Sequence, residues 1–155
     1  MDSSHALDRE CWAAAIVESV VPRIESGRSV NYHLRLATKI YQQPAGLVAN
    51  GELLEMDVAP HRPDSAASSA TRLEVLFANT GGRHIETRGE LQIRRPDNSL
   101  AATLELPTMY TLPGARSRAG IVLPDLPRGR YVLLAVFDFG GDELTAGQIE
   151  YEVPG

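Results

Sequence analysis

The residue types that usually carry out chemistry are present in this chain, but their spacing fits no metal or thiol site. There are four histidines, and no two of them lie at the separation that metal ligands require: His5, His33, His61 and His84. Cys11 is the only cysteine, so the chain can form neither an internal disulfide nor a multi-cysteine metal cage. We therefore expect the histidines to be surface residues, and we predict no metal site.

One acidic turn offers oxygen ligands. Asp138, Asp142 and Glu143 flank two glycines, and carboxylate oxygens bind calcium. Their spacing matches no EF-hand loop, which favours a solvated hairpin turn. The sequence also has no Gly-x-Ser-x-Gly elbow and no P-loop, and Cys11 has no evident histidine partner. We predict that the protein is not an enzyme, with no catalytic residues and no cofactor.

Composition and charge are those of an ordinary globular chain. The 155 residues are 43% hydrophobic and 23% charged, which is typical of one or two folded domains. The net charge of −5 has the wrong sign for neutralising phosphates, so nucleic acid is not an expected partner. The apolar run at residues 12–17 is too short to span a bilayer and follows three charged residues, so we expect no membrane insertion and see no signal peptide.

Two elements precede the main body. Residues 7–21 are rich in alanine and place several apolar residues on one side of a helix, but their β-branched residues also allow a strand. After a turn at residues 25–28, an alternating stretch puts six residues on one face: Val30, Tyr32, Leu34, Leu36, Thr38 and Ile40. We expect a short helical or extended segment followed by a long, half-buried edge strand.

Seven further strands are predicted downstream. Turn residues separate alternating runs at 52–58, 71–79, 84–95, 100–106, 116–123, 130–139 and 145–153. Seven strands without an intervening helix indicate an all-β fold, an immunoglobulin-like antiparallel β-sandwich. Tyr131 opens the sixth of these strands, where the hydroxyl of a tyrosine corner bonds to the upstream backbone. The predicted organisation is a leading segment (1–29), the long strand (30–46) and the sandwich (47–155).

The inward-facing residues of these strands form the predicted core. They are Leu73, Val75, Phe77, Leu91, Ile93, Leu104, Leu106, Leu133, Ala135, Phe137, Ile149, Tyr151 and Val153. Arginines alternate with apolar residues along several of the same strands, and we interpret them as gatekeepers that keep exposed strands soluble, in preference to a binding patch.

Residues 34–46, with the sequence LRLATKIYQQPAG, resemble the end of the first domain of bacterial periplasmic pilus (fimbrial) assembly chaperones. In that family an alternating strand runs into a lysine, bulky apolar or aromatic residues and a Pro-Ala step. The segments at 77–81, 112–114, 129–131 and 139–141 resemble, in the same order, the second, immunoglobulin-like domain of chaperone-like bacterial proteins.

This resemblance implies a non-enzymatic module that binds pilin-like protein subunits by β-strand donation. The subunit-binding residues would be Val30, Tyr32, Leu34 and Leu36, which fill a groove, and Lys39, which anchors a terminal carboxylate. The family's partner arginine lies on the first strand of its first domain, and too few residues precede the sandwich here to form that domain. The chain is then either a fragment or a shortened relative whose leading strand pairs with something else.

Two other functions compete with strand donation. The chain could be a structural immunoglobulin-like module of a bacterial surface or envelope protein. A carbohydrate-binding accessory domain is a third option, with the aromatic candidates Trp12, Tyr32, Tyr41 and Tyr110. An alternating apolar strand does not remain alone in water, so we expect residues 30–36 to pair within the chain, with a second copy or with a subunit. The resemblance implies a periplasmic or cell-surface location.

Overall fold

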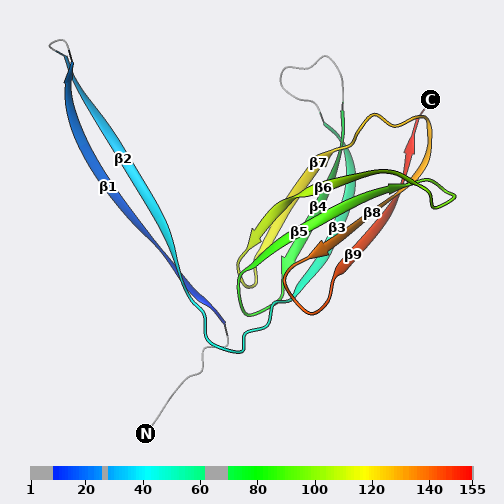
Figure 1. Ribbon diagram of the computed structural model, residues 1–155, viewed down its shortest axis with the longest axis horizontal. Coiled ribbons are helices and arrows are strands. Elements are labelled where there is room, and N and C mark those ends of the chain that lie inside the picture. The colour runs from blue at the N-terminus through cyan, green and yellow to red at the C-terminus, as the bar shows by residue number, and fades with distance from the viewer. Residues whose placement is uncertain (1–8, 26–27, 62–69, 155) are drawn as a thin grey trace, which may run out of the picture. The chain divides into compact units, whose positions relative to one another are not determined.

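The structure is a computed structural model that describes residues 9–25, 28–61 and 70–154 (Figure 1). The chain divides into two compact units, Met1–Ala45 and Gly46–Gly155. Nine strands are present in the described residues, two in the first unit and seven in the second. Among these residues there is no helix that is long and apolar enough to cross a membrane.

The first unit is a β-hairpin. Its strands are β1 (Cys11–Glu25) and β2 (Arg28–Gln42), which pair antiparallel without a register shift from Cys11 opposite Gln42 to Glu25 opposite Arg28. The predicted long strand is therefore real and is paired along one edge. The leading segment and this strand, predicted as separate parts, form a single element.

Of the two conformations left open for residues 7–21, the helical one is wrong and the extended one is correct. Positions 11–21 belong to β1, while positions 7 and 8 lie outside the described residues. Alanine favours a helix only weakly, and an antiparallel partner with matching β-branched and aliphatic residues overrides that preference. Ile16 and Val17 lie opposite Ala37 and Leu36 of β2.

The second unit is an immunoglobulin-like β-sandwich, as predicted. Its strands are β3 (Gly51–His61), β4 (Ala70–Asn79), β5 (Ile85–Arg94), β6 (Leu100–Thr111), β7 (Arg116–Val122), β8 (Gly129–Asp138) and β9 (Thr145–Val153). One antiparallel sheet has the order β3-β4-β7 and the other the order β6-β5-β8-β9. The fourth strand, β6, pairs with the third and not with the fifth, so the strand distribution differs from that of antibody constant domains.

The core lies between the two sheets and contains the predicted inward residues. Leu73, Phe77, Leu91, Leu133 and Phe137 belong to three different strands and are fully buried. The rings of Phe77 and Phe137 lie 5.5 Å apart at a tilt of 51°, a favourable arrangement for aromatic pairs. The predicted residues of β9 are partly buried and pack against this cluster.

Strand β6 is longer than predicted. The predicted strand ended at Leu106, but β6 continues through Pro107 to Thr111 and buries Met109. A register shift absorbs the proline: Gly89 lies opposite Leu106, while Thr87 lies opposite Met109. Because β6 is at the edge of its sheet, a proline there breaks no inner hydrogen bond.

Asn79 fixes the end of β4 to the neighbouring turns. Its side chain is buried and its Nδ2 donates to the carbonyl oxygens of Arg83, at 2.8 Å, and Thr111, at 2.9 Å. Its Oδ1 accepts from the amide of Gly81 at 2.9 Å. All three of these hydrogen bonds therefore serve backbone groups that a hydrophobic residue would leave unpaired.

The tyrosine corner predicted at the start of β8 is confirmed. Tyr131 is buried, and its hydroxyl donates to the carbonyl oxygen of Pro127 at 2.8 Å. Leu126, just upstream, packs against the core. This bond connects the loop between β7 and β8 to the start of β8.

We expect Tyr131→Phe to lower the free energy of unfolding by about 1 kcal/mol, because the ring still packs while the hydrogen bond to the Pro127 carbonyl is lost. Tyr151→Phe is a matched control, since its hydroxyl lies 3.4 Å from Thr71 Oγ1 and forms a weaker bond. Urea unfolding of the full chain measures both. Equal losses in the two variants would contradict a special role for the corner.

We expect Asn79→Asp to lower the free energy of unfolding by about 2–4 kcal/mol at neutral pH, because a buried carboxylate would face two carbonyl oxygens. The loss should shrink as the pH falls toward about 4, where the protonated carboxyl donates one bond. Comparing denaturant midpoints of both proteins at the two pH values measures this. A loss that does not change with pH would show that the carboxylate reaches water.

Candidate functional site

The hairpin has two faces of different chemistry. Directly opposite residues of an antiparallel pair share a face, so the register sorts the side chains from Ala13 to Val21 and from Tyr32 to Ile40. The apolar face consists of Ala13, Ala15, Val17, Ser19, Val21, Tyr32, Leu34, Leu36, Thr38 and Ile40. The mixed face consists of Trp12, Ala14, Ile16, Glu18, Val20, His33, Arg35, Ala37, Lys39 and Tyr41.

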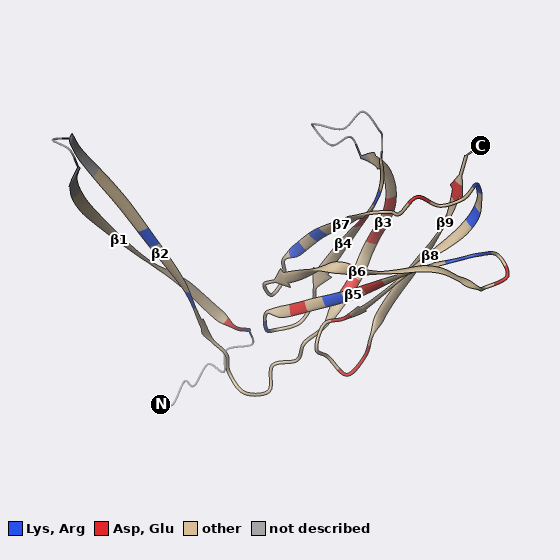
Figure 2. Cartoon of the chain, turned by 45° about the horizontal axis from the view of Figure 1, so that its top comes forward, with Lys and Arg blue, Asp and Glu red and all other residues tan. Residues whose placement is uncertain are grey.

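The apolar face contains no charged residue and is open. Its six large side chains, from Val17, Val21, Tyr32, Leu34, Leu36 and Ile40, are each 46–73% exposed. Figure 2 shows that long stretches of both hairpin strands carry no charged residue. Surfaces of this kind usually mark a site of contact with another molecule.

All charges of this part of the hairpin lie on the mixed face. Arg35 Nε donates to Glu18 Oε2 at 3.0 Å, and His33 Nδ1 lies 3.4 Å from Glu18 Oε1. Arg35 and Glu18 are directly opposite in the register. Both side chains are well exposed, so this pair contributes little to stability and serves mainly to keep the face soluble.

The structure brings together only part of the predicted site. Tyr32, Leu34 and Leu36 share the apolar face, and the register puts Val30 in line with them, although the side chain of Val30 lies outside the described residues. Lys39 is exposed but lies on the mixed face, opposite Ala14. Lys39 would therefore contact a partner from one face of β2, whereas Tyr32, Leu34 and Leu36 would contact it from the other face.

The sequence interpretation missed half of the apolar face. Val17 and Val21 of β1 lie opposite Leu36 and Tyr32 and widen the face to two strands. The β-branched residues of this segment were the available signal, but they were consistent with either conformation. Their position on the same face as Leu36 depends on the register, which a single sequence does not specify.

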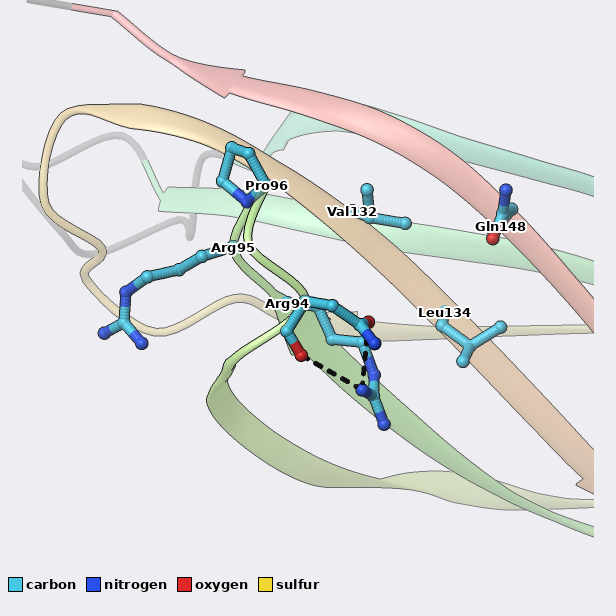
Figure 3. A pocket seen from close by; sticks show the side chains of 7 residues that line it. Arg94, Arg95, Pro96, Val132, Leu134 and Gln148 are labelled. Carbon is cyan, nitrogen blue, oxygen red and sulfur yellow. Dashed lines mark hydrogen bonds between the residues drawn. The ribbon is translucent and has the colours of Figure 1, made fainter.

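A second candidate lies on the outer face of the four-stranded sheet. Val132, Leu134 and Val136 of β8 point outward and are partly buried. A shallow hollow of about 390 Å³ lies beside Leu134 and Val132 and is bordered by Arg94, Arg95, Pro96, Asn98 and Gln148 (Figure 3). A second hollow of about 760 Å³ continues along Val136 toward Glu86 and Arg88.

The polar groups around these hollows are already engaged with each other. Arg94 Nη1 donates to Asn98 Oδ1 at 3.1 Å and Arg94 Nη2 to Gln92 Oε1 at 2.6 Å. Arg88 Nη2 donates to Glu86 Oε1 at 2.8 Å, and this bond raises the pKa of Arg88. Acidic and basic residues alternate along β5 in Figure 2. A ligand would have to replace these bonds, so the hairpin is the stronger candidate.

In the acidic turn that was considered as a calcium site, Asp138 has a structural role. Asp138 Oδ1 accepts from the amide of Gly140 at 2.8 Å and so caps the turn that follows β8. Within residues 9–25, 28–61 and 70–154, no three His, Cys, Asp or Glu residues gather in a way that could hold a metal ion.

Comparison with known proteins adds little beyond the fold. No family model and no curated protein matches the chain. Among solved structures, a CARDB domain from Pyrococcus furiosus, crystallised in complex with di-metal ions, is similar at 14% identity and a TM-score of 0.42, over 66% of this chain and 87% of that one. The immunoglobulin-like assignment therefore depends on the strand order and tyrosine corner of this chain.

We expect Lys39→Ala to change the free energy of unfolding by less than about 0.5 kcal/mol, because an exposed lysine on a two-stranded hairpin buries little. If Lys39 anchors the carboxylate of a partner, the same change should weaken complex formation. Arg35→Ala is the control, since it removes the exposed partner of Glu18 from the same face. Thermal unfolding measures the first effect, and a marked drop in the midpoint for Lys39→Ala alone would indicate a structural lysine.

Proposed function

We propose that this chain is a non-enzymatic, structural immunoglobulin-like module of a bacterial surface or envelope protein. The observation that carries the proposal is that the sandwich encloses its own core. Leu73, Leu91, Leu133 and Phe137 are fully buried between the sheets. The hydroxyl of Tyr131 bonds to the backbone of the loop that precedes β8. Such a domain keeps its shape without a partner and can hold other parts of a protein in place.

The outer face of the three-stranded sheet supports this proposal. Arg118 lies 3.3 Å from Glu74 and 3.6 Å from Glu55, which joins all three strands by ion pairs across the surface. Charges on an outward face keep a sheet from stacking on other sheets. The sandwich therefore supplies a stable, soluble body, and the hairpin supplies the exposed apolar surface.

Strand donation to a pilin-like subunit is the second candidate. The favouring observation is that β2 pairs with β1 along one edge and, within the part of the chain that the structure describes, with no strand along the other. An incoming strand could add to that edge through main-chain hydrogen bonds. The location in the periplasm belongs to this second candidate, as does the proposed anchoring by Lys39.

Amide hydrogen exchange of the full chain distinguishes the two candidates. For a structural module, the amides on the outer edge of β2 should exchange at the same rate with and without a purified pilin-type subunit that lacks one strand of its sandwich. The amides of β4, β5 and β8 act as an internal reference, because they lie in central strands. Protection of the outer β2 amides on adding the subunit would replace our proposal with strand donation.

A further inference from the structure

The apolar face of the hairpin is not covered by the hairpin itself. Strand pairing satisfies the backbone between β1 and β2, but it covers neither face of a two-stranded sheet. The central pair of the apolar face, Val17 and Leu36, is 63% and 73% exposed on the hairpin. This face therefore needs a cover that comes from outside the hairpin.

The chemistry of the face is self-complementary. Its five paired levels, from Ala13 and Ile40 to Val21 and Tyr32, include no charged residue. A two-fold contact places a patch against an identical patch, so a charge on the axis would meet its own sign, and a patch without charges avoids this cost. The charges of Glu18, Arg35 and Lys39 all lie on the mixed face, where they would stay in water after such a contact.

The size of the face also fits a second copy. Six large side chains that lose roughly 100 Å² each amount to about 600 Å² per copy and about 1,200 Å² for two. Stable protein interfaces begin at about this total area. Sheets also pack face to face through alternating side chains, as the two sheets of the sandwich do in this chain.

We propose that two copies of this chain form a homodimer by packing the apolar faces of their hairpins against each other, around a two-fold axis close to Val17 and Leu36. The inference rests on the hairpin being the contact element of the structural module proposed above. It differs from strand pairing with a second copy, one of the options that the sequence left open, because the contact uses the side chains of a face and leaves the outer edge of β2 unpaired.

Two neighbouring residues of β1 provide matched variants. Val17 is on the apolar face and Ile16 on the mixed face, and both are β-branched and similarly exposed, at 63% and 68%. Val17→Lys would bury a charge in the dimer, whereas Ile16→Lys would place it in water. We expect Val17→Lys to raise the dimer dissociation constant by about tenfold or more and Ile16→Lys to leave it within about twofold.

The measurement is sedimentation or light scattering of the full chain over a concentration series up to about 100 μM. Loss of the dimer in Val17→Lys alone supports the proposal. A wild-type monomer over this range overturns it, without affecting the exchange test of the structural module. A dimer that survives Val17→Lys, or that both variants abolish, also overturns face-to-face packing.

Cross-linking supplies a second readout that does not depend on adding a charge. In a Cys11→Ser background, Val17→Cys should give a covalent dimer with a short bis-maleimide, because residues near a two-fold axis approach their own copies. Ile16→Cys should give little dimer at the same protein concentration. Equal cross-linking of the two variants would contradict the proposal, and near-ultraviolet circular dichroism checks that the sandwich is folded in both.

Discussion

A β-strand with an apolar face needs two things at once, a partner for its backbone and a cover for its side chains. The seven strands of the sandwich obtain both, because each pairs within a sheet and faces the other sheet across the core. The hairpin obtains only the first. Tyr131, Asn79 and the edge position of Pro107 all contribute to the closed sandwich, whereas β1 and β2 leave large apolar side chains in water.

The distribution of charge follows from this difference. On the sandwich, charged residues point outward and pair across strands, as Arg118 does with Glu55 and Glu74. On the hairpin, from Ala13 to Val21 and from Tyr32 to Ile40, the charged residues lie on one face and the other face has none. A two-stranded sheet is only marginally stable alone. A partner that covers the apolar face would therefore stabilise the hairpin.

The sandwich could be predicted from the sequence because its signals are local. Alternation of apolar residues defines the strands, and turns rich in Gly, Pro, Asn and Asp separate them. The hairpin depends on non-local information. The segment that begins at Cys11 is ambiguous by propensity, and only pairing with β2 decides it. The sequence alone could have placed Lys39 and Leu36 on different faces, since residues an odd number of positions apart along a strand point to opposite sides.

Faces and edges of the hairpin are independent, and this decides how the possible functions relate to each other. Donation of β2 uses backbone groups along its outer edge, whereas packing through Val17 and Leu36 uses side chains that project from the sheet. A partner strand added to the edge would leave the side chains of the apolar face uncovered. Dimerisation and strand addition therefore do not exclude each other geometrically, and the apolar face requires a cover in either case.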